Sequence, residues 1–186
     1  MTMQKIIPGL LDNTFEFFNL EEDLKFINEG KLKSFTEAPA SVFIMLREAI
    51  EKNPEAKSIL MEWHPENEFN QLKKFASCKF GGIDYSPDIK DGELQQGEYW
   101  ECPNAGACKG EGIICTLPTY NGQILSKIDI KLIKLSTTEK TNEAIADEMS
   151  LPMGTFHKYK HQLYEKLGFI QTKQSLTKIA INLNII

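Results

Sequence analysis

The chain has 186 residues, of which 41% are hydrophobic and 25% are charged, so it can bury a core but is too short for three ordinary domains. No run approaches the roughly 18 apolar residues that a membrane span needs. Acidic residues interrupt the N-terminus where a signal peptide would be continuously apolar. We therefore expect a soluble, cytoplasmic protein of one or two small domains with no membrane partner.

Charge is divided unequally along the chain. The net charge is −5, yet residues 1–124 hold 12 basic and 20 acidic residues, whereas residues 125–186 hold nine lysines and six acidic residues. The C-terminal part thus carries +3 and the rest −8, an asymmetry typical of proteins in which one part faces nucleic acid. Arg47 is the only arginine, so the basic part lacks bidentate guanidinium contacts.

Residues 9–76 are predicted to be mainly helical. Val42, Met45, Leu46 and Ala49 recur at i, i+3, i+4 and i+7, which indicates one face of a helix that Asn53-Pro54 ends. Further helices are expected from about residue 55 to 63 and from about 66 to 76. The apolar groups between residues 10 and 27 have mixed helical spacing, and we interpret them as helical core as well.

Residues 78–120 are rich in Gly, Pro, Asp and Cys and show no apolar periodicity. All four cysteines lie here, spaced C-x23-C-x5-C-x6-C: Cys78, Cys102, Cys108 and Cys115. In a reducing cytoplasm such a group favours four thiolate ligands to zinc, with an iron–sulphur cluster as the alternative. A metal would replace the core that so long a loop lacks. Because no CxxC pair is present, four ordinary cysteines without metal remain a further alternative.

Residues 121–186 return to helical periodicity after the Asn121-Gly122 turn. Ser126 and Asp129 have the S-x-x-[DE] form of a capping box, which predicts a helix of about ten residues. Thr141 precedes a second short helix as its expected N-cap. A last helix is expected from Lys173 to about Leu183.

A third helix of this part opens after Pro152 and ends at Gly168. Its apolar stripe, at i, i+3, i+7, i+8 and i+11, is Phe156, Tyr159, Leu163, Tyr164 and Leu167. The residues off the stripe are cationic or hydrogen-bonding: His157, Lys158, Lys160, His161 and Gln162. Two helices joined by about four residues, the second longer, have the layout of a helix-turn-helix, whose second helix fits the major groove of DNA. An ordinary solvated helix face is the alternative.

The C-terminal part resembles the LuxR-type (GerE-like) DNA-binding domain of bacterial transcription regulators over the ungapped stretch LSKIDIKLIKLSTTEKTNEAIADEMSLPMGTFHKYKHQLYEKLGF. The agreeing positions are Leu125-Ser126, Asp129, Leu132, Ile133, Leu135, Thr141-Asn142, Ile145-Ala146, Thr155-Phe156 and Tyr164-x-Lys166-Leu167-Gly168. The chain departs from the family pattern at Glu139, where the family has glycine, and at Ala144, Pro152 and Lys160.

The resemblance implies a four-helix domain that binds double-stranded DNA with its third helix. His157, Lys158 and His161 would then face base edges, Thr155 would lie near a phosphate, and Lys160 and Lys166 would add backbone contacts.

In such domains the fourth helix commonly pairs two protomers, so the resemblance also implies a homodimer interface on that helix. The apolar residues concerned are Leu176, Ile179, Ala180, Leu183 and Ile185. The alternative is that these residues close the core of the domain.

Taken together, the sequence predicts a mainly α protein: a helical region over residues 1–77, a cysteine-rich segment over 78–120 as the candidate metal-binding region, and a helix-turn-helix domain over 121–186. We expect a sequence-specific transcription regulator and not an enzyme, because the phosphate-loop, nucleophile-elbow and zinc-protease motifs are missing and His64 stands alone. Two alternatives are a module that docks on RNA polymerase or a partner regulator, and a regulator that senses metal or redox state through its cysteines.

Overall fold

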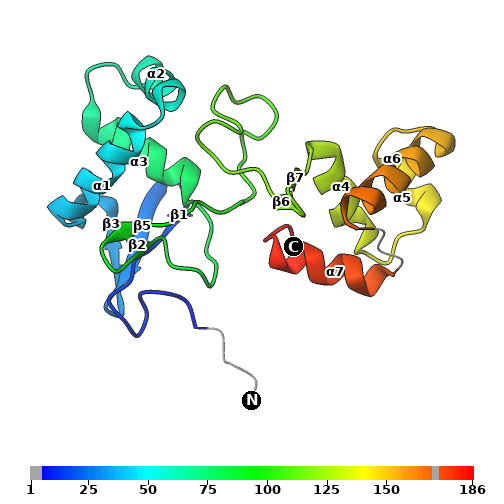
Figure 1. The fold of residues 1–186 in the computed structure, drawn as a ribbon, viewed down its shortest axis with the longest axis horizontal. Coiled ribbons are helices and arrows are strands. Elements are labelled where there is room, and N and C mark those ends of the chain that lie inside the picture. Colours follow the sequence, from blue (N-terminus) through cyan, green and yellow to red (C-terminus); the bar gives the residue numbers. More distant parts are fainter. Residues whose placement is uncertain (1–5, 169–171) are drawn as a thin grey trace. The chain divides into compact units, whose positions relative to one another are not determined.

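The structure is a computed structural model that describes residues 6–168 and 172–186. The chain divides into two compact units, Met1–Thr116 and Leu117–Ile186 (Figure 1). The described residues are 44% helical, and 13% lie in three small antiparallel sheets. The prediction of a mainly α protein is therefore wrong, because the fold is mixed α/β.

The main error lies at the start of the first unit, where a three-stranded sheet replaces the expected helices. Its strands are β1 (Glu16–Leu20), β2 (Asp23–Asn28) and β3 (Lys31–Ser34), paired antiparallel in the order β1-β2-β3. Leu24, Phe26 and Asn28 are buried while the residues between them are less so, which is the period of two that a strand requires. Glu29 and Gly30, with φ of 51° and 70°, form the two-residue turn between β2 and β3.

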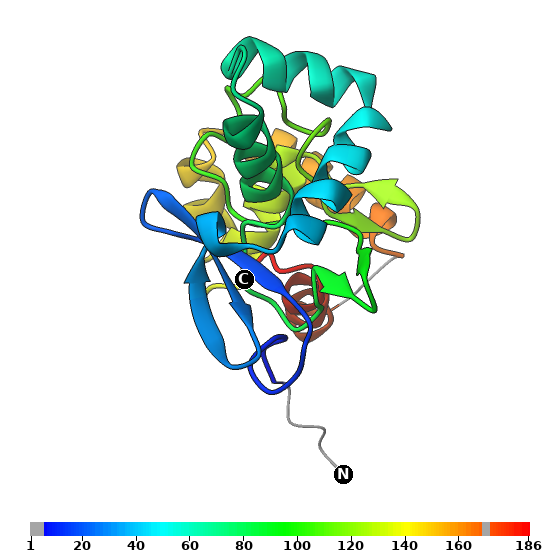
Figure 2. The same cartoon turned by 90° about the vertical axis from the view of Figure 1, so that its left-hand side faces the viewer.

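Three helices follow and confirm the helical predictions for residues 42–76. Their bounds, after a short 3-10 turn at Phe35–Glu37, are α1 Ala40–Glu51, α2 Pro54–Trp63 and α3 Glu68–Lys79. Asn53 and Asn67 cap α2 and α3, because their side chains accept hydrogen bonds from the backbone N–H groups of Ala56 and Asn70. In Figure 2 the blue strands lie beneath these cyan and teal helices.

An aromatic core joins the sheet to the helices of the first unit. Phe17, Phe26, Phe35 and Phe80 have no exposed surface, and the Phe17 ring lies within 6.2 Å of the Phe35 and Phe80 rings, centroid to centroid. Each such burial stabilises the fold by about 2–3 kcal/mol before the entropy of ordering is subtracted. The core predicted from the apolar groups between residues 10 and 27 therefore exists around Phe17 and Phe26, but these residues lie in strands and not in helices. Phe35 and Phe80 were not part of that prediction.

The segment after α3 packs along the free edge of β1. The Phe15 and Asn19 N–H groups donate to the carbonyls of Ile89 (3.1 Å) and Gly81 (3.1 Å). A hairpin of β4 (Ile89–Lys90) and β5 (Glu93–Leu94) turns at Asp91-Gly92. This segment and the cysteine loop that follows it belong to the same compact unit as the sheet and the three helices.

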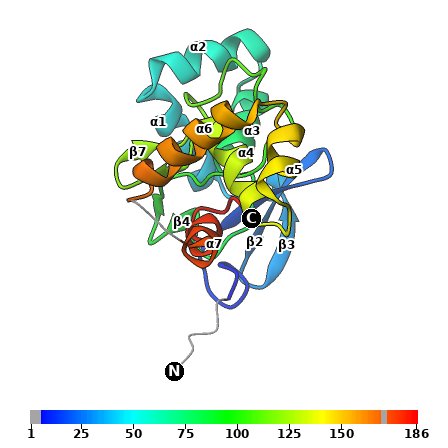
Figure 3. The ribbon, with the colours of Figure 1, turned by 90° about the vertical axis from the view of Figure 1, so that its right-hand side faces the viewer.

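The second unit contains a hairpin and four helices (Figures 1 and 3). They are β6 Thr119–Tyr120, β7 Gln123–Ile124, α4 Lys127–Ser136, α5 Asn142–Glu148, α6 Met153–Lys166 and α7 Lys173–Asn182. The predicted capping box is confirmed, with the Ser126 side chain accepting from Asp129 N–H and the Asp129 carboxylate accepting from Ser126 N–H (2.8 Å). The predicted Thr141 cap is confirmed as well.

Helix α4 is the centre of this unit, because α5, α6 and α7 all pack against it. Leu132 and Ile133 of α4, Phe156 and Leu163 of α6 and Leu176 of α7 are fully buried. Of the residues considered for a dimer interface, Leu176, Ile179 and Ala180 of α7 are buried, as is Ile185 after the helix, and Leu183 is half-buried. Ile181 and Ile186 are the large apolar side chains that stay exposed in this region.

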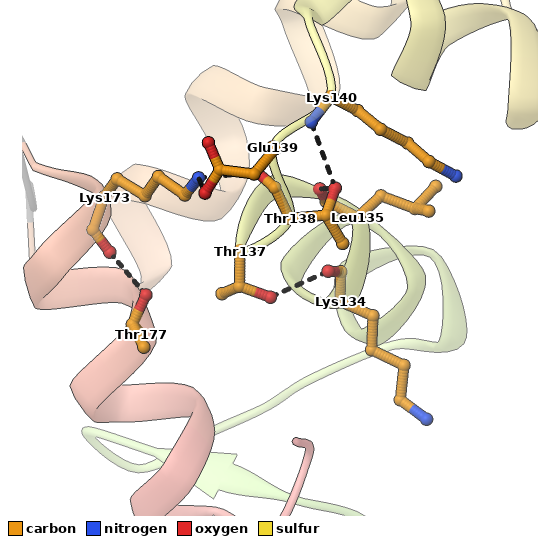
Figure 4. A network of polar contacts seen from close by, with 8 residues as sticks. All are labelled: Lys134, Leu135, Thr137, Thr138, Glu139, Lys140, Lys173 and Thr177. Carbon is orange, nitrogen blue, oxygen red and sulfur yellow. Dashed lines mark hydrogen bonds and ion pairs between the residues drawn. The ribbon is translucent and has the colours of Figure 1, made fainter.

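The corner between α4 and α5 carries a network of polar contacts that fixes the start of α7 (Figure 4). The hydroxyl groups of Thr137 and Thr138 donate to the carbonyls of Lys134 and Leu135, both at 2.7 Å, which satisfies the last turn of α4. Lys173 of α7 donates to the Thr138 carbonyl (2.6 Å) and pairs with Glu139 (3.4 Å). Glu139 has no left-handed backbone, so this corner needs no glycine there.

Among the described residues, no helix is both long and apolar enough to cross a membrane.

Candidate nucleic-acid interface

Helix α6 has one buried face and one exposed face. Phe156, Leu163 and Leu167 are at most 2% exposed and project to the side that packs on α4 and α5. At 3.6 residues per turn, the exposed residues of α6 fall within an arc of about 140° on the opposite side. That arc comprises Gly154, His157, Lys158, His161, Gln162 and Glu165, and we call it the α6 outer face.

The turn between α5 and α6 sets the direction of this face. Ser150 adopts a left-handed backbone with φ of 55°, and the Leu151 N–H donates to the Ala146 carbonyl (2.9 Å). Pro152, with φ of −59°, then starts α6. The four residues from Met149 to Pro152 thereby join α5 to the longer α6 in the helix-turn-helix layout predicted from sequence.

The three residues expected to meet base edges are all exposed. His157 lies beside Glu143 of α5, and His161 Nε2 lies 3.4 Å from Glu165 Oε1 on the next turn. Lys158 forms no hydrogen bond or ion pair with the described part of the chain. The α6 outer face therefore presents imidazole, ammonium and amide groups to solvent from rigid helical positions.

The two other lysines expected to contact DNA lie in internal contacts instead. Lys160 donates to Asn142 Oδ1 (2.8 Å), its ammonium lies 5.6 Å from the centre of the Tyr164 ring, and burial lowers its pKa. Lys166 donates to Asp129 Oδ2 (2.6 Å), within the α4 capping box. Both lysines thus hold the unit together, and contact with a phosphate would require them to leave these partners.

The first turn of α6 leaves backbone donors without a side-chain acceptor. Pro152 stands at the N-cap and makes no side-chain cap hydrogen bond. The N–H groups of the first helical residues therefore face outward next to half-buried Thr155, where the sequence placed a phosphate contact.

Sequence reasoning missed Gly154, which lies on the α6 outer face. A Cβ atom added at Gly154 would meet nothing within 4 Å, and its backbone is ordinary helix. Neither packing nor backbone geometry of the chain itself requires glycine there, although glycine in a helix costs up to about 1 kcal/mol relative to alanine. A glycine in the first turn of a predicted helix whose other off-stripe residues are polar was visible in the sequence, and it is the signal that would have found this position.

All four cysteines lie in the first unit. Cys78 lies in the last turn of α3 and the other three lie in the loop after Trp100, and all four are free thiols. Burial raises the pKa of Cys78 to about 11, and Cys115, Cys102 and Cys108 are near enough to act on it electrostatically. Among residues 6–168 and 172–186, no group of three or more His, Cys, Asp or Glu side chains is arranged to hold a metal ion.

A group of buried carboxyl groups in the first unit was also not predicted. Burial raises the pKa of Glu16 to about 8 and that of Glu98 to about 7, and it raises the pKa of Asp88 well above its ordinary value. Glu16 Oε1 accepts from Asp84 N–H (2.8 Å), whereas buried Glu16 Oε2 has no hydrogen-bond partner. These residues are up to 82 positions apart in the printed sequence, so no local pattern connects them.

Comparison with family models, with curated proteins and with solved structures finds no match to this chain.

Proposed function

We propose that this protein is a sequence-specific regulator of transcription that binds double-stranded DNA with α6 in the major groove. The observation that carries the proposal is the division of α6 into a fully buried apolar face and an outer face that presents His157, Lys158 and His161. A helix whose orientation is fixed by its buried side can hold polar side chains against base edges at low entropic cost.

The chemistry of the α6 outer face fits the major groove. Lys158 is a donor suited to guanine O6 and N7, whereas His157, His161 and Gln162 can donate to or accept from base edges. The exposed first-turn N–H groups beside Thr155 fit a phosphate, which would set the register of the helix on the duplex. Acidic Glu165 lies on the same face one turn beyond His161, with its carboxylate 3.4 Å from His161 Nε2, and adds one negative charge at the C-terminal end of that face.

The surroundings of α6 support the same function. The second unit carries a net charge of +3, from nine lysines against six acidic residues, which favours a polyanion. Its α4–α7 order, with α5 and α6 as the helix-turn-helix pair, agrees with the LuxR-type domain that its sequence resembles.

The proposal is tested with the full-length protein and a pool of random-sequence duplexes, selected over several rounds and then titrated at several salt concentrations. We expect enrichment of one short sequence and an affinity that falls as salt rises, since counterions are released from each neutralised phosphate. Replacing His157 or His161 by alanine should weaken binding to the selected sequence by about 5- to 150-fold, equivalent to 1–3 kcal/mol per base contact.

Lys158 and Lys178 offer a matched pair for this test, since both are exposed and neither forms a hydrogen bond or ion pair with the described residues. Lys158→Ala should weaken binding strongly and Lys178→Ala only slightly, although both remove one positive charge. Equal effects of the two substitutions, or a pool without enrichment and without salt dependence, would favour a unit that docks on another protein.

A further inference from the structure

The strongest feature outside the proposed DNA interface is the pattern of exposure in the cysteine loop. From Glu101 to Lys109 every residue is exposed except Cys102 and Cys108, which are half-buried. The two cysteines are thus the only residues of this stretch that are partly shielded from solvent. Solvation alone does not select cysteine at both half-buried positions.

Two backbone turns start at these cysteines. The Ala105 N–H donates to the Cys102 carbonyl (3.0 Å), and the Glu111 N–H donates to the Cys108 carbonyl (3.3 Å). A third contact, between Gly106 N–H and the Glu111 carboxylate (2.9 Å), ties the two turns together. Each of the two cysteines therefore stands at the start of a hydrogen-bonded turn, which holds its backbone in a defined shape.

The other two cysteines are more deeply packed, and their thiols are near enough to those of Cys102 and Cys108 to interact electrostatically. Cys78 is buried at the end of α3, where its carbonyl accepts a hydrogen bond from the Trp100 indole (3.1 Å). Cys115 packs against the core and its thiol lies 3.8 Å from the Gly110 carbonyl. Apolar anchors are scarce between residues 101 and 116, where Ile114 is the only fully buried large side chain.

We propose that Cys78, Cys102, Cys108 and Cys115 bind a thiophilic metal centre, either one Zn²⁺ ion or an iron–sulphur cluster. Each thiol gives up its proton to solvent when its sulphur binds the metal, so four thiolates surround the centre. Binding would draw the four sulphur atoms together and fix the loop on α3, a role that side-chain packing fills elsewhere in the unit. Both centres need the same four ligands, and they differ in colour and composition.

The test is made on full-length protein purified separately in air and without oxygen. We expect either one zinc per chain and no visible absorption, or iron with acid-labile sulphide and a brown colour in the oxygen-free sample. In either case a chelator should release the metal, and an alkylating reagent should then modify four cysteines that it did not reach before. Metal below 0.1 per chain in both preparations, with four thiols freely alkylated, would overturn the proposal.

Matched variants test whether the cysteines of the loop are the ligands of the metal. Cys108→Ser should lower the bound metal at least tenfold, whereas Ala107→Ser, which introduces the same side chain at the neighbouring exposed position, should leave it unchanged. Cys102→Ser serves as the second variant should Cys108→Ser fail to fold, as judged by circular dichroism. None of these measurements involves DNA, so their outcome is independent of the function proposed for α6. Equal metal content in Cys108→Ser, Cys102→Ser and Ala107→Ser would contradict the ligand assignment.

Discussion

At the scale of single residues, Gly154 is a position at which the requirement of the fold differs from the requirement of the proposed DNA binding. The fold would tolerate a methyl group there, since nothing lies within 4 Å of the added atom. If α6 enters a groove, however, that methyl group meets the duplex. The same substitution therefore acts with opposite signs on stability and on affinity.

We expect Gly154→Ala to stabilise the second unit by up to about 1 kcal/mol, because alanine loses less backbone entropy in a helix. It should weaken DNA binding by about 1–3 kcal/mol, the usual cost of forcing an extra methyl group into a packed contact. Thermal unfolding and titration with the selected duplex measure the two effects. Unchanged affinity in Gly154→Ala would show that this end of α6 does not approach DNA closely.

Lys166 gives a second residue-scale prediction. Burial alone would raise the pKa of Asp129, but hydrogen bonds from Lys166 and Ser126 outweigh it and lower that pKa. The resulting stability is present above the ordinary aspartate value of 3.8 and is lost as pH falls through the lowered value. Lys166→Met leaves the buried carboxylate short of a charged partner and should destabilise the unit by about 1–3 kcal/mol at pH 7.

The control for Lys166→Met is Asp129→Asn with Lys166 retained, measured by urea unfolding at pH 7 and pH 3. The difference between wild type and Lys166→Met should shrink at pH 3, where Asp129 begins to take up a proton. If Lys166→Met binds DNA poorly but unfolds like the wild type, then Lys166 contacts a phosphate and does not stabilise the unit.

At the scale of elements, α7 is attached to the unit in two ways, one polar and one apolar. Lys173 meets the α4–α5 corner through Thr138 and Glu139, but its side chain is 46% exposed. Leu176, one turn further on, is fully buried against the core. Exposed ion pairs contribute little, whereas a buried leucine contributes several times more.

We therefore expect Leu176→Ala to destabilise the second unit by about 2–4 kcal/mol and Lys173→Ala by less than about 1 kcal/mol. Chemical unfolding followed by circular dichroism distinguishes these values, and Lys178→Ala on the same helix is the control. A larger loss in Lys173→Ala than in Leu176→Ala would mean that the corner, and not the core, holds α7.

Elements with local signals were predictable, and those without were not. Helices α4 and α5 begin directly after their N-cap residues, Ser126 and Thr141. These starts were predictable because a cap is a contact between residues within four positions of each other. The strands of the first unit were missed because adjacent aromatic residues obscure the alternation of apolar and polar residues by which a strand is recognised. The turns at Gly30 and Gly92 nevertheless indicated hairpins. The sequence shows that the four cysteines lie in one segment. That Cys78 lies near the other three depends on tertiary packing, which no local pattern predicts.

At the scale of the whole molecule, the two units respond to pH through different groups. Among the described residues, the carboxyl groups with raised pKa values, Glu16, Asp88 and Glu98, all lie in the first unit. Their protonated forms are favoured on folding, so their stabilising effect is complete below pH 4.5 and is lost as pH rises through 7 and 8.

We expect the first unit to lose about 2–5 kcal/mol of stability between pH 5 and pH 8.5 while the second unit changes little. The two tryptophans, Trp63 and Trp100, both lie in the first unit, so fluorescence reports its unfolding alone and circular dichroism reports both. Glu16→Gln should flatten the fluorescence-detected pH dependence, and Glu22→Gln on an exposed turn should not. A first unit whose fluorescence transition is equally stable at both pH values would contradict this account of Glu16.

If α6 binds DNA as proposed, its length limits how many base pairs one copy of the protein can contact. Its 14 residues extend about 21 Å, and only a part of one side is available to bases, which corresponds to about four base pairs. A four-letter word recurs by chance about every 256 positions in any genome. Under this proposal, recognition of a single promoter requires a longer site, in which a second copy or another regulator binds the neighbouring base pairs.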